Sequence, residues 1–171
     1  MSARLRPAEP DDAAGIRAVQ LAAFPTAAEA DLVEALERDG DVVVSLVVET
    51  DGGISGHVLL SRMRATGDGR GLRALGLGPV AVAPRIQGSG LGTALIEGAL
   101  GIARATKEDL VFVLGEPDYY RRFGFSAEAA APFASPYAGP YFMALALRPD
   151  RAPPVRGEAA YARAFSDLPG K

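Results

Sequence analysis

The 171-residue sequence contains no cysteine and no tryptophan, and His57 is its single histidine. The lack of cysteine excludes disulfide bonds, thiolate catalysis and zinc sites built from cysteine side chains. One histidine is too few for the histidine clusters that usually hold catalytic metals. We therefore expect no metal cofactor.

Strong positive charge and long apolar runs are also missing. Lysine and arginine are scattered, and the formal net charge is −3. This balance argues against nucleic acid or an anionic membrane as the main partner, although a small anionic ligand needs only a local positive field. Residues 1–10 lack the apolar core of a signal peptide, and no apolar stretch reaches the length of a membrane span. We expect a soluble cytoplasmic protein that acts as a monomer or a homodimer.

The length suits one domain with a full hydrophobic core and is too short for two ordinary domains. Residue patterning predicts strands at 2–7, 42–50, 54–64, 72–83, 110–114 and 141–147, with helices near 10–24, 27–39, 91–106 and 117–122. Hairpins come first and a strand–helix–strand crossover follows. This order favours an α+β or mixed α/β fold.

The most informative segment is a glycine-rich turn between an apolar strand and a helix. Gly88, Gly90 and Gly92 leave the backbone N–H groups between Gln87 and Thr93 uncovered where the helix begins. The first N–H groups of a helix lack partners, and the helix dipole is positive at that end. The segment is therefore predicted to bind a phosphate-bearing ligand.

Two nucleotide-binding motifs do not fit this turn. A P-loop requires a lysine after its last glycine, and none follows Gly92. A dinucleotide fingerprint requires a third glycine where this chain has Thr93 or Leu95.

The segment Gln87-Gly88-Ser89-Gly90-Leu91-Gly92 instead matches the Gln/Arg-x-x-Gly-x-Gly/Ala signature of the GNAT superfamily of N-acetyltransferases. Residues 80–84 resemble the strand before that signature, and residues 119–125 resemble the family's Tyr-x-x-x-Gly-Phe segment. The resemblance covers roughly residues 3–148 and implies a central mixed, mostly antiparallel sheet flanked by helices. Residues 1–171 then form a single N-acetyltransferase domain, in which residues 149–171 are a C-terminal extension.

The resemblance also implies acetyl-CoA as co-substrate, with its pyrophosphate over the glycine turn. Glycines there allow a close approach that a Cβ would block. The pantetheine arm is expected to pair with the preceding strand like an added strand, and a break at Gly76 or Gly78-Pro79 is compatible with the slot for it. The cofactor-binding residues implied in this way are Val80, Ala81, Val82, Gln87, Gly88, Ser89, Gly90, Leu91, Gly92 and Thr93.

By the same resemblance the enzyme is an acyltransferase in which an amine attacks the thioester directly. The leaving thiolate needs a proton or a hydrogen bond, and Tyr120 occupies the position of the family's acid. The amine must first lose a proton, but residues 72–83 contain no carboxylate. Glu29, His57 or a water chain are the open choices for this general base, and we select Glu29 with Tyr120 as the catalytic pair.

The acceptor is expected to be a primary amine on a small molecule or a peptide, and the loop at residues 132–140 is expected to shape its pocket. Two alternatives stay open. One is an acyltransferase that uses another acyl-CoA. The other is a non-catalytic domain that binds or senses CoA, which the missing strand carboxylate favours.

Overall fold

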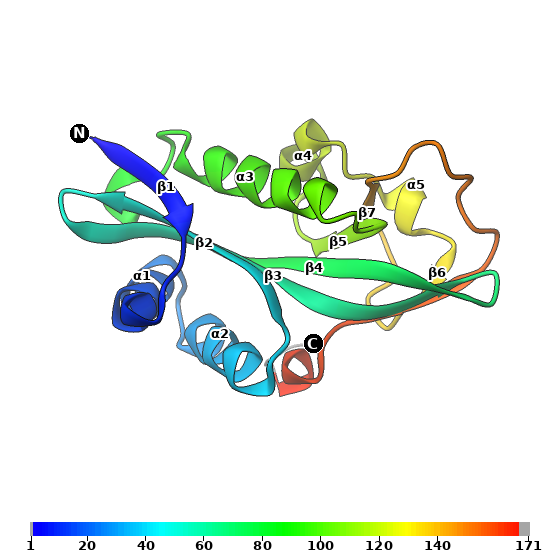
Figure 1. Cartoon of the computed structure of the whole chain (residues 1–171), viewed down its shortest axis with the longest axis horizontal. Coiled ribbons are helices and arrows are strands. Elements are labelled where there is room, and N and C mark those ends of the chain that lie inside the picture. Colours follow the sequence, from blue (N-terminus) through cyan, green and yellow to red (C-terminus); the bar gives the residue numbers. More distant parts are fainter. Residues whose placement is uncertain (1, 168–171) are drawn as a thin grey trace. The chain divides into compact units, whose positions relative to one another are not determined.

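The computed structural model describes residues 2–167 (Figure 1). These residues divide into two compact units, one made of residues 2–60, 78–102 and 163–167 and the other of residues 61–77 and 103–162. The last four residues of the C-terminal extension lie outside the described part.

The strands are β1 (Ala3–Pro7), β2 (Val42–Thr50), β3 (Gly53–Gly67), β4 (Arg70–Val82), β5 (Leu110–Leu114), β6 (Phe133–Ala134), β7 (Phe142–Ala146) and β8 (Gly157–Ala160). The α-helices are α1 (Ala13–Ala23), α2 (Ala28–Asp39), α3 (Leu91–Ala105), α4 (Pro117–Tyr120) and α5 (Ala127–Ala130). Short 3-10 helices are η1 (Pro10–Asp12), η2 (Pro84–Ile86), η3 (Arg121–Phe123) and η4 (Arg163–Asp167).

The strands are hydrogen-bonded in the order β1-β2-β3-β4-β5-β7, and β8 pairs with β3 and β6. The β4–β5 and β6–β8 pairs are parallel. The β1–β2, β3–β8 and β5–β7 pairs are antiparallel. The expected mixed, mostly antiparallel sheet with flanking helices is thus confirmed.

In the first unit, helices α1 and α2 lie on one face of the strands and α3 lies on the other (Figure 1). The β1–β2 register pairs Ala3 with Thr50 and Pro7 with Leu46. A Cβ on Gly98 of α3 would stand 3.0 Å from Leu5 and 3.2 Å from Leu46, so glycine lets this helix approach both strands closely.

The second unit is built around stacked aromatic rings. Phe112 of β5 stacks on Phe142 of β7 with ring centres 5.3 Å apart, and Phe133 meets Phe112 edge-on at 5.1 Å. All three rings are buried. Such rings contribute to stability through both buried area and ring geometry.

The hairpin of β3 and β4 is longer than the sequence pattern predicted. The expected loop at residues 67–71 is reduced to a tight turn, in which Asp68 and Gly69 have φ angles of 51° and 80°. The Asp68 carboxylate accepts hydrogen bonds from the backbone N–H groups of Val155 and Arg156. Because these donors lie in the C-terminal extension, the local sequence of the hairpin does not reveal them.

Candidate active site

The glycine-rich turn lies in the first unit, where β4 passes through η2 into α3. Residues 87–90 are exposed, and α3 begins at Leu91. Gly88 and Gly90 have φ angles of 81° and 90°, in the left-handed region that favours glycine. No atom lies within 4 Å of a Cβ built on either residue, so the surface above the turn is open.

The turn presents a run of free backbone donors. Within residues 2–167, the N–H groups of residues 88–93 donate to no protein acceptor, whereas Gln87 N–H donates to Pro84 O at 3.4 Å. The free run therefore starts at Gly88, one residue later than expected, and extends to Thr93. Helix α3 has 15 residues, and its dipole adds a positive potential at this end.

Two side chains of the turn point back to the protein. Gln87 Nε2 donates to Val82 O at 3.0 Å, and Ser89 Oγ donates to Ile86 O at 2.5 Å. Both bonds hold side chains of the turn against backbone carbonyl groups of the residues before it. The groups of the turn that stay free are then backbone N–H groups, whose positions do not depend on a flexible side chain.

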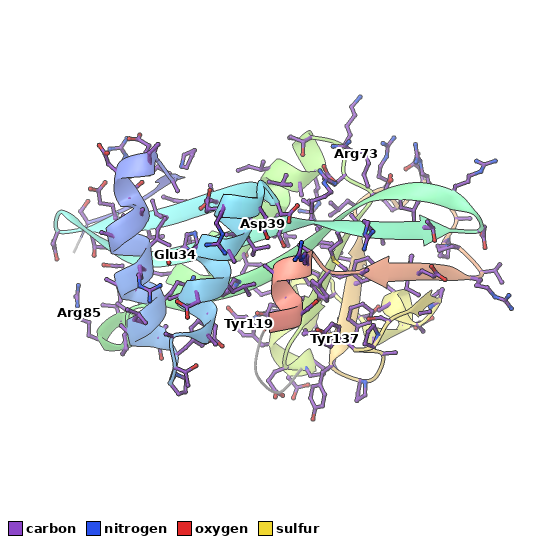
Figure 2. The ribbon with its side chains drawn as sticks, turned by 90° about the horizontal axis from the view of Figure 1, so that it is seen from below. Glu34, Asp39, Arg73, Arg85, Tyr119 and Tyr137 are labelled. Atoms are coloured by element: carbon purple, nitrogen blue, oxygen red, sulfur yellow. The ribbon has the colours of Figure 1, made fainter. Side chains whose placement is uncertain are left out.

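Arg85 was not singled out in the sequence, although it is the only charged residue between 83 and 93. It lies in η2, directly before the turn, and its side chain projects from the ribbon (Figure 2). A guanidinium at this place adds positive charge beside the free N–H groups. The sequence signal that could have identified Arg85 is a single charged residue directly before a glycine-rich turn.

The strand residues expected to meet the pantetheine arm lie at the end of β4. Ala81 is buried, whereas Val80 and Val82 are half-buried and share one face because strand side chains alternate. The pairing of β4 with β5 includes Ala74, Leu75 and Gly76. Gly78 then has a φ angle of 127°, which interrupts the regular strand geometry.

Glu29 lies in the first turn of α2, in the same unit as the glycine turn. Its Oε1 atom is buried and has no hydrogen-bond partner among the described residues. The nearby carboxylates of Asp31 and Glu34 differ, because both pair with Arg17 at 3.0 and 3.1 Å. Glu29 is thus a carboxylate with free acceptor capacity.

His57 is a packed core residue. Its side chain is buried, with Nδ1 2.9 Å from Gln20 Nε2 and Nε2 2.9 Å from Ser45 Oγ. Burial lowers the pKa of His57 to about 4. With both ring nitrogens engaged inside the unit, His57 has no free nitrogen to offer an incoming amine.

Tyr120 lies at the end of α4, in the second unit. Its ring contacts Tyr119 and Phe125 edge-on, with ring centres 5.0 and 5.9 Å away. Burial, followed by the neighbouring Tyr119, raises the pKa of Tyr120 to about 12. No described residue accepts a hydrogen bond from the Tyr120 hydroxyl.

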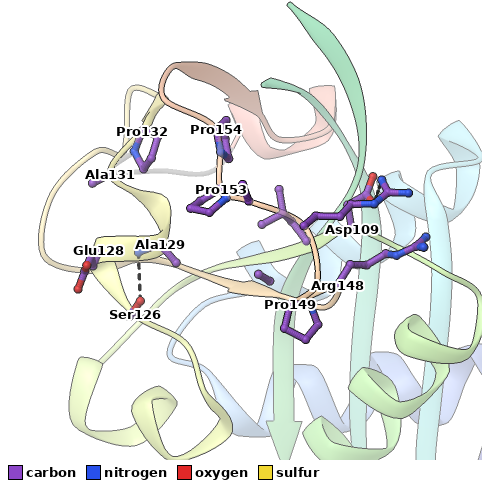
Figure 3. A pocket seen from close by; sticks show the side chains of 14 residues that line it. Asp109, Ser126, Glu128, Ala129, Ala131, Pro132, Arg148, Pro149, Pro153 and Pro154 are labelled. Atoms are coloured by element: carbon purple, nitrogen blue, oxygen red, sulfur yellow. Dashed lines mark hydrogen bonds and ion pairs between the residues drawn. The ribbon is translucent and has the colours of Figure 1, made fainter. Parts of the chain in front are cut away.

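A cavity with a volume of about 770 Å³ lies elsewhere, in the second unit (Figure 3). Two of its polar side chains are engaged with protein: Asp109 pairs with Arg151 at 3.3 Å, and Ser126 Oγ accepts from Ala129 N at 3.1 Å. The loop at residues 132–140, expected to shape the acceptor pocket, reaches this cavity through Pro132, whereas none of the predicted catalytic or cofactor-binding residues lines it. Size alone therefore does not mark the site.

Across residues 2–167, no helix combines the length and the apolar character needed to cross a bilayer. The same residues contain no group of three or more histidine, aspartate or glutamate side chains placed to hold a metal ion.

The sequence matches the family profile described as an acetyltransferase (GNAT) domain over residues 4–127. An uncharacterised N-acetyltransferase of Escherichia coli strain K12, YjhQ, is 36% identical over 132 residues, or 75% of this chain and 73% of that protein. The crystal structure of the Escherichia coli GNAT family N-acetyltransferase YhbS in complex with CoA matches with a TM-score of 0.88 at 31% identity, covering 97% of this chain and 93% of that one. A GNAT family acetyltransferase from Brucella melitensis in complex with acetyl-CoA matches with a TM-score of 0.78 at 35% identity, covering 96% and 98%.

Proposed function

The chain belongs to the GNAT family of acetyltransferases, and on this basis we propose that it transfers the acetyl group of acetyl-CoA directly to a primary amine. The acceptor is a small molecule or a peptide. Residues 1–171 act as one domain in this proposal, because β3 and β4 each contribute residues to both compact units.

The observation that carries the proposal is the run of free N–H groups from Gly88 to Thr93 at the start of α3, of which residues 88–90 are exposed and residues 91–93 partly buried. A pyrophosphate carries the negative charge and the closely spaced oxygens that such a run accepts. Two relatives of this chain were crystallised with CoA and with acetyl-CoA. We assign the turn to the pyrophosphate, and Val80, Ala81 and Val82 to the pantetheine arm.

The reaction begins when the amine loses a proton, because an ammonium group has no lone pair for attack. Glu29 is the proposed base, since its Oε1 is free of protein partners. The amine nitrogen then bonds to the acetyl carbon, and the negative charge on the carbonyl oxygen is held by a backbone N–H near Val82. The carbonyl then re-forms as the carbon–sulfur bond breaks, the nitrogen releases its extra proton to solvent to give the neutral amide, and the sulfur leaves as a thiolate.

Tyr120 acts on the leaving thiolate. Because burial raises its pKa to about 12, the phenol is protonated at neutral pH and is able to donate. A thiol ordinarily has a pKa of about 8.5, so complete proton transfer from this phenol to the thiolate is uphill. We therefore assign Tyr120 as a hydrogen-bond donor to the leaving sulfur, with the final proton supplied by solvent.

Thermal unfolding in the presence of acetyl-CoA, CoA, NAD and ATP tests the donor. A ligand at one hundred times its Kd adds about 2.7 kcal/mol of stability, which raises Tm by about 5–10 °C in a domain of this size. We expect this increase with acetyl-CoA and CoA alone. Stabilisation by NAD or ATP without any response to CoA contradicts the proposal.

A panel of primary amines with detection of the released CoA thiol tests the transfer. Amine-dependent thiol release is the expected result. The alternative of a CoA-binding domain without catalysis draws on the lack of a carboxylate in β4. This alternative predicts that the chain binds CoA and that no amine increases the rate at which the thioester is hydrolysed.

A further inference from the structure

Gly115 follows β5 at the place where the Tyr120 ring comes closest to the backbone. A Cβ built on Gly115 would clash with Tyr120 Cε2 and stand 2.8 Å from Tyr120 Cδ2. Real Cβ atoms do not approach other atoms so closely. The φ angle of Gly115 lies outside the left-handed region, so its backbone accepts any residue. Only the Tyr120 ring excludes a side chain from this position.

The backbone around this contact is held on both sides. Gly115 N–H donates to Tyr141 O at 3.1 Å, and the adjacent Leu114 pairs with Phe142 in the β5–β7 ladder. Tyr120 N–H donates to Glu116 O at 3.1 Å within the first turn of α4. A side chain added at Gly115 would therefore displace the ring more readily than the backbone. Restoring an ordinary contact of 3.4 Å to Cε2 requires a movement of about 1 Å.

Aromatic rings confine Tyr120 on its other sides. Phe125 is buried and meets the Tyr120 ring at an interplanar angle of 82°. Tyr119 meets it at 90°, and Phe123 lies 6.3 Å from it between ring centres. The ring thus occupies a slot whose backbone wall is Gly115, and its hydroxyl has no acceptor among the described residues.

We propose that Gly115, together with Phe125, is a positioning residue that fixes where the Tyr120 hydroxyl stands during acetyl transfer. The proposal rests on the role assigned to Tyr120 in the proposed function. A hydrogen bond to a leaving sulfur is sensitive to placement, because a misplacement of 1 Å lowers rates by about 100-fold. An alanine at Gly115 brings about such a displacement without removing the hydroxyl.

The test is a double-mutant cycle of Gly115→Ala and Tyr120→Phe. Turnover is measured as CoA thiol release from acetyl-CoA, with n-butylamine, histamine, spermidine and lysine methyl ester as acceptors. We expect kcat to fall about 10- to 100-fold in Gly115→Ala, while the Kd for acetyl-CoA stays within twofold of wild type. In the Tyr120→Phe background, Gly115→Ala is expected to cause no further loss, because the hydroxyl it positions is already gone.

Gly101→Ala is the matched control. Gly101 is an exposed residue of α3, and nothing lies within 4 Å of a Cβ built there. This variant is expected to keep wild-type kcat. Phe125→Leu is the second variant, used if Gly115→Ala does not fold, and it loosens the ring from another side. It is expected to lower kcat without changing the Kd for acetyl-CoA, again only while the Tyr120 hydroxyl is present.

Carbon–proton NMR spectra of the tyrosine rings report the displacement without any acceptor. The chain has five tyrosines, and Tyr120→Phe identifies the signal of this one by its disappearance. The Tyr120 signal is expected to shift in Gly115→Ala, where the ring currents of Phe125 and Tyr119 act on it differently. It is expected to stay in place in Gly101→Ala.

Three outcomes overturn the inference. Unchanged kcat in Gly115→Ala, with Tyr120→Phe impaired, overturns it and leaves the role of Tyr120 intact. An equal loss from Gly115→Ala in both backgrounds means that Gly115 acts through the fold and not through the hydroxyl. Full turnover in Tyr120→Phe removes Tyr120 from the reaction and overturns the proposed role and the inference together.

Discussion

Replacing Gly88 or Gly90 with alanine tests the assignment of the glycine turn to the CoA pyrophosphate. Both residues have left-handed backbones, and a Cβ on either one would meet no protein atom within 4 Å. The substitution therefore strains the backbone without creating a clash inside the protein. Holding an L-residue in the left-handed region costs about 1–2 kcal/mol.

The loss of affinity follows from the same geometry. If the turn relaxes away from the left-handed conformation, its N–H groups no longer converge on one anion. Each hydrogen bond to a charged group contributes about 1.5–3 kcal/mol, and 1.4 kcal/mol corresponds to a tenfold change in Kd. We expect each variant to bind acetyl-CoA about 10- to 100-fold more weakly than wild type and to lose about 1 kcal/mol of unfolding free energy.

Isothermal calorimetry with two ligands makes the assay specific. Acetyl-CoA contains the pyrophosphate, whereas S-acetylpantetheine lacks it. The glycine variants are expected to weaken binding of the first ligand and not of the second, and Gly101→Ala is expected to change neither. If Gly88→Ala and Gly90→Ala both bind acetyl-CoA within twofold of wild type, the pyrophosphate does not lie on this turn.

Three further predictions concern buried or partly buried side chains. Glu29→Gln keeps the shape of the side chain but removes the base, so turnover is expected to fall at least tenfold while the affinity for acetyl-CoA stays unchanged. Unaltered turnover would mean that water, and not Glu29, is the general base. His57 has a folded pKa of about 4 against an ordinary value of 6.5, so its neutral form supports folding fully above pH 6.5 and loses that contribution as pH falls towards 4. The difference corresponds to about 3 kcal/mol, and urea unfolding at pH 7 and pH 4.5 is expected to show a shallower pH dependence in His57→Gln than in wild type. Glu108 is buried, whereas its partners Arg62 and Arg73 reach solvent. Glu108→Gln is therefore expected to lower the free energy of unfolding in urea by about 1–2 kcal/mol, less than the 3–5 kcal/mol lost when a fully buried pair is broken. A loss below about 0.5 kcal/mol would mean that solvent screens both ion pairs completely.

Elements whose signals are local were predicted well from the sequence. The apolar runs at residues 42–50 and 110–114 form β2 and β5 with the expected bounds. Helix α2 ends at Asp39, and Gly40 follows with a φ angle of 75° and an N–H bond to Glu37 O. Glycine supports that conformation at little cost, so the helix end is visible in the sequence.

Elements that depend on distant partners were missed. Helix α5 and strand β6 were absent from the prediction, since one has four residues and the other two. Strand β6 gains its partner only from β8, where Phe133 lies opposite Gly157. A two-residue strand has no pattern of its own, and its existence is decided by the chain that packs against it.

The candidate site divides in the same way. The order of glycines from Gly88 to Gly92 predicts an anion-binding helix start, because Gly88 and Gly90 adopt left-handed conformations that other residues rarely take. Which carboxylate has a free oxygen, and whether His57 is accessible, depend on what packs around each side chain.

The sequence by itself determined the GNAT family, and it predicted the cofactor turn and the position of Tyr120 as the family's acid. These features reside in short segments whose backbone conformation follows from their own residues. Only the tertiary structure decided that Gln20 and Ser45 engage both nitrogens of His57, and that Gly115 lies against the Tyr120 ring. Burial and contact arise between residues far apart in the chain or on separate elements, so no local pattern records them.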